Sequence, residues 1–262
     1  MTARVASLAT LALLLCYAAF GPLLAPSSAA DVDFSATGIG PGAAHWFGTD
    51  SSGRDLFAMV AQGMRVSLAI AFATALLSTA FGLAVGLAAG TLGGWWDRIG
   101  MRVADVMTAI PSLLLSLLIV AMFRGSVVAI VVSLVLTHWT TVARVVRSDV
   151  LPLRNAEYVE AARLSGLPRR RVISIHLLPP ATAQAAIGGA LLVAHAIWHE
   201  STLSFLGVGL PPHEASLGTL LSDAQESLLL GQWWLLVFPA GAIVACTLAL
   251  TVIAHSVGRQ RR

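Results

Sequence analysis

The sequence predicts an all-α integral membrane protein with six membrane-spanning helices. Of its 262 residues, 57% are hydrophobic and only 11% are charged, whereas about a quarter of the residues of a soluble domain are charged. The mean hydropathy of +0.82 agrees with this composition. Six stretches are apolar over the roughly 20 residues that a helix needs to cross a bilayer.

The predicted spans divide the chain into three parts. They cover residues 5–25, 66–90, 101–123, 127–146, 181–208 and 233–257. Arg4 before the first span and the small residues that follow it suggest a signal peptide, but the apolar run is long for a signal core, so we expect a retained helix. Residues 1–65 are then predicted to hold this helix and an outer loop, residues 66–257 to form a five-helix transmembrane core, and residues 258–262 to form a cytoplasmic tail.

Arginine orients the chain in the membrane, because positively charged loops stay on the cytoplasmic side. All 16 basic residues are arginine. With cytoplasmic termini, 13 of the 16 lie inside and 3 lie outside. The inside set is Arg4, Arg98, Arg102, Arg144, Arg147, Arg154, Arg163, Arg169, Arg170, Arg171, Arg259, Arg261 and Arg262, and the outside set is Arg54, Arg65 and Arg124. This topology also explains the net charge of +3, so no nucleic-acid partner is expected.

The cysteines, one proline and one outer segment allow more detailed predictions about the spans and the loops between them. Cys16 and Cys246 lie in apolar stretches and are expected to be small buried hydrophobic residues. Pro111 lies inside the third span, where its missing N–H interrupts the helical hydrogen bonds and predicts a kink. The outer segment 209–232 is polar and is expected to include a short helix.

A polar cytoplasmic loop at residues 147–180 separates the fourth and fifth spans. Asn155 is a suitable N-cap for a first short helix, and Gly166 permits a left-handed turn at its end. A second helix over 169–178 is expected to stop at the Pro179-Pro180 pair. By charge alone, the loop would be a solvated segment whose arginines bind anionic membrane lipid.

The order of residues in this loop resembles the EAA loop of ABC-importer permeases. The matching positions are Glu160, Ala161, Ala162, Gly166, Leu178 and Pro179. The ending His176-Leu-Leu-Pro179 is similar to that of the peptide and nickel branch. The resemblance implies a cytoplasmic coupling helix that fits a groove on an ATPase subunit, with Glu160 anchoring the turn and Ala161 and Ala162 allowing close approach.

The resemblance extends from about His45 to Val257. The segment from His45 to Asp50, followed by Gly53-Arg-Asp55, resembles the outer signature of dipeptide, oligopeptide and nickel permeases, and Leu203-Ser-Phe-Leu-Gly-Val-Gly209 resembles their fifth span. Membership implies the type I ABC-importer permease fold in the bacterial cytoplasmic (inner) membrane. The implied partners are a second permease, which makes a heterodimer, two ATP-binding subunits and an extracytoplasmic substrate-binding protein.

No cofactor is expected on this chain itself. A Walker A loop requires lysine, and the sequence has none. ATP and Mg²⁺ are therefore expected on the partner subunits. The chain is predicted to be a transport subunit without catalytic residues.

Three ionisable residues stand together in the fifth span, and such residues usually face a cavity or a partner. His195 and His199 are four apart and share a helix face, a spacing that permits transient metal binding. Glu200 lies about 100° further round the helix. His138, in the fourth span, is a further candidate that we expect near the cytoplasmic surface.

These residues leave several functions open. Because imidazole suits nickel, the first prediction is half of a translocation pore for nickel or a nickel chelate. The alternative is dipeptide or oligopeptide uptake by the same architecture, with the histidines lining a polar path or bonding between helices. An intramembrane metal-dependent enzyme would use His195, His199 and Glu200 around a metal, but it would need a third ligand and an access path, and the sequence identifies neither. A proton-coupled carrier would use Asp105 and Glu200, but no internal repeat supports it.

Overall fold

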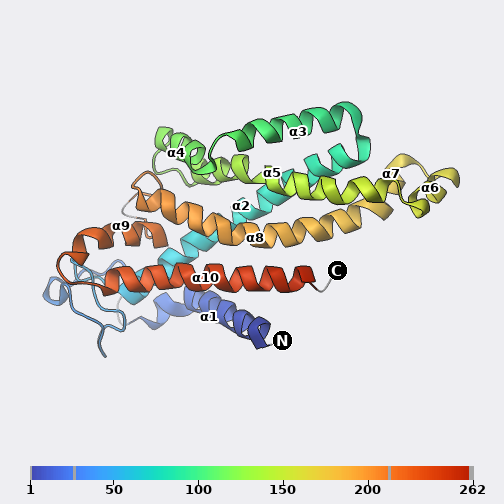
Figure 1. Ribbon diagram of the computed structural model, residues 1–262. Helices are drawn as coiled ribbons and strands as arrows, with labels where there is room; N and C mark the ends of the chain where they lie inside the picture. Colours follow the sequence, from blue (N-terminus) through green and yellow to red (C-terminus); the bar gives the residue numbers. More distant parts are fainter. Residues whose placement is uncertain (1, 26–27, 212–213, 260–262) are drawn as a thin grey trace.

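The computed structural model describes residues 2–25, 28–211 and 214–259 (Figure 1). Within these ranges nearly all regular structure is helical, and Thr49 and Asp55 form an isolated β-bridge. In chain order the elements are α1 (Thr2–Leu24), η1 (Phe34–Ala36), α2 (Leu56–Leu92), α3 (Gly94–Ala109), α4 (Ser112–Met122), α5 (Val127–Arg154), α6 (Glu157–Leu164), α7 (Arg169–Val172), η2 (Ile173–Leu177), α8 (Leu178–Phe205), α9 (Leu217–Leu228) and α10 (Trp234–Arg259). Pro212, Arg261 and Arg262 lie outside the described residues.

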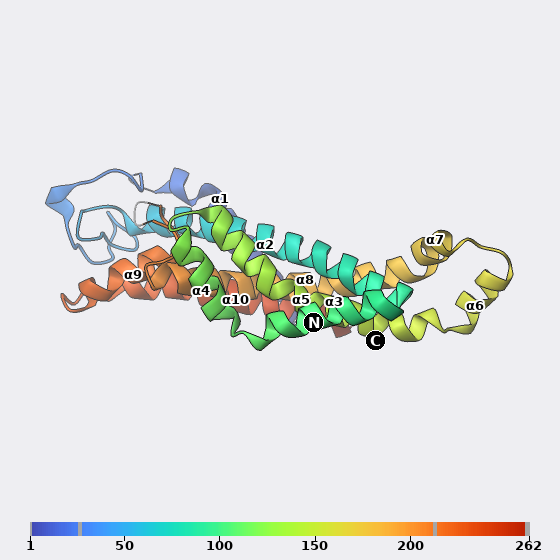
Figure 2. The ribbon, with the colours of Figure 1, turned by 90° about the horizontal axis from the view of Figure 1, so that it is seen from above.

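Five helices are long and apolar enough to cross a membrane, namely α1, α2, α5, the run from α7 to α8, and α10. The α3–α4 pair supplies a sixth span if it is counted as one. The α6–α7 segment lies at one end of the bundle, and the loop before α2 and helix α9 lie at the other (Figures 1 and 2). The predicted separation of the EAA loop from the outer loops is therefore confirmed.

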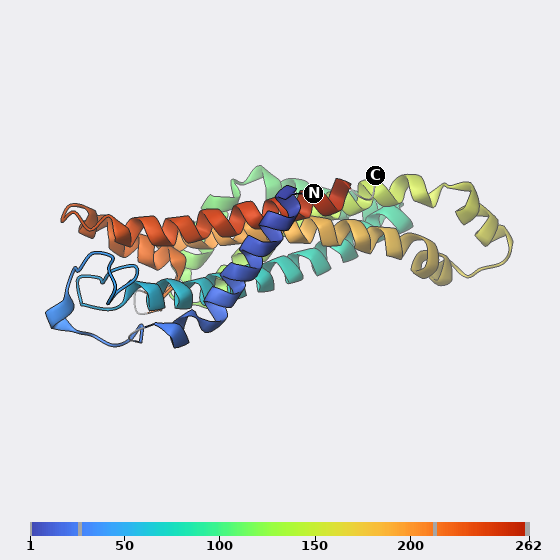
Figure 3. The same cartoon turned by 90° about the horizontal axis from the view of Figure 1, so that it is seen from below.

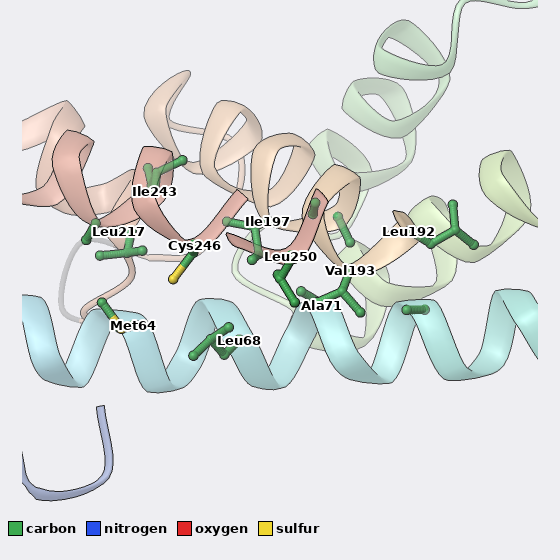
Figure 4. Close-up of a cluster of buried hydrophobic side chains, with 14 of the residues drawn as sticks. Met64, Leu68, Ala71, Leu192, Val193, Ile197, Leu217, Ile243, Cys246 and Leu250 are labelled. Carbon is green, nitrogen blue, oxygen red and sulfur yellow. The ribbon is translucent and has the colours of Figure 1, made fainter. Parts of the chain in front are cut away.

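Helix α2 is central to the bundle and packs most extensively on α5 and α8, with α1 also against it, whereas α10 packs mainly on α8, α1 and α9 (Figures 1 and 3). Side chains of α2, including Met64 and Leu68, pack against Ile197 of α8 and Leu250 of α10 (Figure 4). Cys246 is buried in this core as predicted, whereas Cys16 on α1 is exposed.

Glycines bring α2 close to α5. Gly82, Gly86 and Gly90 are spaced by four residues and therefore share one face of α2. A Cβ atom added to Gly86 would lie 2.5 Å from the carbonyl oxygen of Ala143 and 2.9 Å from Cβ of Val146. Small residues at this spacing let membrane helices pack backbone against backbone, and the sequence analysis did not identify them.

Helix α2 begins before the predicted second span. The side chain of Asp55 caps it by accepting a hydrogen bond from the N–H of Ala58. Arg65 therefore lies inside α2, where its guanidinium donates to the carbonyl oxygens of Ala18 and Ala19 in α1. Pro22 has no N–H to offer the carbonyl of Ala18, so the arginine replaces that bond. The predicted division of the chain between residues 65 and 66 therefore falls inside α2 and not at the end of a helix.

The third predicted span is broken rather than kinked. Helices α3 and α4 meet at an angle of 82° around Ile110 and Pro111. Ile110 is extended (φ −91°, ψ 129°), as is usual for a residue before proline. The end of α3 is held by Arg144 of α5, which donates to the carbonyl of Ala104 at 3.3 Å and to the hydroxyl of Thr108 at 2.7 Å. A side chain from the neighbouring helix thus stabilises the break.

Two details of the predicted EAA loop are wrong. Asn155 ends α5, and Ala156 is the N-cap of α6, without a side-chain hydrogen bond. The second helix does not stop at Pro179, because α7 continues through the π-helical turn η2 directly into α8. Prolines are tolerated in the first turn of a helix, and the wide π turn precedes them. The EAA loop is therefore continuous with the fifth span.

Candidate functional site

The EAA loop folds around a small hydrophobic core of its own. Val159 of α6, Val172 of α7 and Leu177 of η2 are fully buried against one another. Gly166, between the two helices, has φ +83°, which confirms the predicted left-handed turn. No heavy atom lies within 4 Å of the position that its Cβ would take. The requirement for glycine here is therefore conformational and not steric.

The outer face of α6 is open. Glu160 and Ala161 are exposed, and Ala162 is partly buried against the small core. Leu164, at the end of α6, is 83% exposed. Leu178 and Pro179 instead form the start of α8. The predicted motif is thus divided between an exposed short helix, a glycine turn and the base of a membrane-spanning helix (Figure 2).

Two arginines attach this loop to the bundle. Arg154 donates to the carbonyl oxygen of Gly90 at 3.2 Å, and Arg169 donates to that of Thr91 at 2.9 Å. Both carbonyls belong to the last turn of α2, where unpaired oxygens and the helix dipole favour a positive charge. Arg154 thus joins the end of α5 to α2, and Arg169 joins the start of α7 to α2.

The histidines lie beside the break between α3 and α4. A cavity of about 480 Å³, here called the histidine pocket, is lined by His138 of α5, by His195 and His199 of α8, and by Pro111 at the break. The rings of His138 and His199 meet edge to face with their centroids 4.9 Å apart. Because α5 extends to Arg154, His138 lies near its middle and not near the cytoplasmic surface as predicted.

Glu200 points elsewhere. Its carboxylate is fully buried and accepts hydrogen bonds from the hydroxyls of Ser67 in α2, at 2.7 Å, and Ser204 in α8, at 2.9 Å. Ser67 in turn accepts from the N–H of Leu217 at the start of α9. Glu200 is not among the residues that line the histidine pocket. Its geometry is that of a buried link between three helices.

Replacing Glu200 with alanine is expected to destabilise the folded protein by about 2–4 kcal/mol. The change leaves two buried hydroxyls without their acceptor, at about 1–3 kcal/mol for each unsatisfied group, and creates a cavity. Thermal unfolding in detergent measures the effect. Glu226→Ala, on the exposed side of α9, is the control and should leave the midpoint unchanged. Equal stability of the two variants would contradict the structural role.

A resident metal centre finds no support in the described part of the chain. Among those residues, no three histidine, cysteine, aspartate or glutamate side chains converge as metal ligands. His195 and His199 line one cavity as predicted, but Glu200 does not join them. The set proposed for an intramembrane enzyme is therefore not assembled.

Comparison with known proteins identifies the family. Residues 82–262 match the family described as "Binding-protein-dependent transport system inner membrane component". The chain is 37% identical over 248 residues to the dipeptide transport system permease protein DppC of Bacillus subtilis, covering 95% of this chain and 78% of that protein. It is 40% identical over 244 residues to the oligopeptide transport system permease protein OppC of Escherichia coli K12, covering 92% and 80%.

A solved structure supports the fold. The crystal structure of an amino acid ABC transporter with histidines superimposes with a TM-score of 0.57 and 17% identity, covering 77% of this chain and 94% of the other. At this identity the likeness concerns the fold alone. The family match and the sequence relatives together show that this chain belongs to the inner membrane component family of binding-protein-dependent transport systems, as a multi-pass permease of the ABC-importer class.

Proposed function

We propose that this chain forms half of the translocation pore of an ABC importer that takes up dipeptides or oligopeptides. The observation that carries the proposal is identity of 37–40%, over more than nine-tenths of the chain, to permeases named for dipeptide and oligopeptide transport. The nickel prediction rested on the histidine pair and on the resemblance of Thr137-His-Trp139 and Arg163-Leu-Ser-Gly166 to nickel-type members. The histidine pair gains no third ligand within the described ranges, so peptide uptake is the better-supported alternative.

We further propose that α6 is the coupling helix. Its exposed surface, with Glu160, Ala161 and Leu164, suits insertion into a groove on an ATP-binding subunit. ATP and Mg²⁺ would be bound by two such partner subunits. Their closure would move α6 and α7 as a unit because Val159 and Val172 pack together. The continuous path through η2 would carry that motion into α8, a rigid-body transition.

The remaining partners follow from the proposed architecture. A second permease would complete the pore, and an extracytoplasmic binding protein would deliver the peptide to the end that holds α9 and the loop before α2. The permease must release its substrate on each cycle, so contacts along the pore would be weak and transient. This requirement also argues against a strong metal site within it.

The test compares two substrates in cells that lack this chain. We expect uptake of a labelled dipeptide to be lost and then restored by the wild-type gene, whereas uptake of radioactive nickel is unchanged. Both assays are run on the same cultures, with growth rate as a check on general damage. Loss of nickel uptake alone would overturn the peptide proposal and return His195 and His199 to the role of metal contacts.

A further inference from the structure

We infer that the histidine pocket is the place where this permease contacts the main chain of its peptide substrate, with His138 as a specificity-determining residue beside His195 and His199. The inference rests on the proposed peptide transport and adds a site within the pore. Three observations support it: the break between α3 and α4, the uncharged polar side chains that line the pocket, and a histidine ring nitrogen there that is free to accept a hydrogen bond.

The break places irregular backbone within the apolar part of the molecule. Ile110 and Pro111 separate α3 from α4 and both line the pocket. In a membrane, such backbone is tolerated where it is buried in protein or borders a water-filled cavity, and interrupted helices commonly mark binding sites of transporters. The pocket lies against this interruption, and His195 on its wall is exposed.

The lining is polar but carries no fixed charge. Its polar groups are the three imidazoles and hydroxyls such as those of Ser112 and Thr141, and no aspartate, glutamate, arginine or lysine is among the described residues that form it. A neutral imidazole offers one donor and one acceptor, and a hydroxyl offers both. A peptide group also presents one N–H and one C=O. The lining therefore matches main-chain amides better than charged side chains.

The hydrogen bonds within the pocket leave capacity for a ligand. Nδ1 of His138 donates to the carbonyl oxygen of Leu134 at 2.8 Å, so in the neutral ring Nε2 remains an acceptor. Nδ1 of His199 is buried and has no hydrogen-bond partner among the residues described. Because this nitrogen is enclosed by protein, it does not itself reach the cavity, and the free ring nitrogen that the inference uses is Nε2 of His138.

Charge neutrality also has a functional consequence. A fixed charge in a pocket of low dielectric would hold one class of peptide and repel another. Imidazoles and hydroxyls that bind the main chain would let acidic, neutral and basic peptides pass with similar ease. The inference therefore predicts that weakening the pocket lowers the uptake of all three classes by similar factors.

The first experiment measures uptake by the full transporter in cells. His138→Ala combined with His199→Ala should reduce uptake of acidic, neutral and basic labelled dipeptides by about tenfold each, the equivalent of one or two hydrogen bonds. His255→Ala is the matched control, because among the described residues the hydrogen bond of His255 is to Thr251 within its own helix. Stimulation of ATP hydrolysis by the binding protein should persist in the double variant, which separates a pore defect from misfolding.

A second measurement applies even if the double variant fails to assemble. Thr141→Cys, in a background with Cys16 and Cys246 changed to alanine, places one thiol at the exposed wall of the pocket. Alkylation of this thiol in the assembled transporter should be slowed by dipeptide together with the binding protein. Normal uptake by the double variant, loss confined to one charge class, or alkylation that dipeptide does not slow would overturn the inference. Failure of the wild-type protein to transport dipeptide would instead overturn the proposed function.

Discussion

Replacing Gly86 with valine is expected to prevent α2 from packing on α5 and to cause loss of most of the folded protein. The first added atom would lie 2.5 Å from the backbone oxygen of Ala143, so no side-chain rotamer relieves the contact. Overpacking of a well-packed core lowers the free energy of unfolding by about 1–3 kcal/mol. Because the added atom here meets backbone, we expect the loss for Gly86→Val to be at or above the upper end of that range. The amount of monodisperse protein in detergent and its midpoint of thermal unfolding measure the effect.

Gly241→Val is the matched control. Gly241 also lies in the interior of a membrane-spanning helix, α10, but no heavy atom lies within 4 Å of its added Cβ. Both substitutions change intrinsic helix propensity by the same amount, so the difference between them isolates packing. Similar yields and similar midpoints for the two variants would show that α2 and α5 do not depend on close approach at Gly86.

Replacing Gly166 with valine is expected to abolish association with the ATP-binding subunits while the bundle remains folded. A β-branched residue at φ +83° costs about 1–3 kcal/mol in strain. That is a factor of about 5–150 in the population of the native turn, and the turn sets the direction of α6 relative to α7. Co-purification of the ATP-binding subunits and dipeptide uptake should both fall, with the yield of the permease itself little changed.

Gly231→Val provides the comparison. Gly231 has φ +79° and open space around its Cβ position, but it lies between α9 and α10 at the opposite end of the bundle (Figure 1). It should suffer the same local strain and keep the ATP-binding subunits. Equal loss of association in both variants would indicate general destabilisation, and retained association in Gly166→Val would contradict the proposed coupling role.

Much of the architecture could be predicted because its causes are local. The membrane spans follow from runs of apolar residues, and the sidedness follows from arginines in the loops. The turn at Gly166 follows from the positive φ that glycine adopts easily. The spacing from Glu160 to Pro179 predicted the EAA loop, and this segment lies within the residues that match the family.

One error arose where a distant side chain stabilises the local structure, and two others concern where helices end. Pro111 predicts a kink in any helix, but Arg144, 33 residues after it in the chain (144 − 111), holds the end of α3 and allows a full break. Asn155 has the chemistry of an N-cap, yet α5 continues to it and Ala156 takes that position. The prolines that were expected to end the second helix follow a π turn, a backbone geometry that no residue pattern here indicates.

The sequence by itself determined the membrane class and the presence of ionisable residues in the fifth span, and it predicted an orientation and an EAA loop. Only the tertiary structure decided where those side chains point. Glu200 and His199 are neighbours in the chain, but the helix directs one to serines of α2 and α8 and the other to His138 of α5. Successive residues of a helix differ by about 100° in direction, and only the packing of neighbouring helices determines what each direction meets.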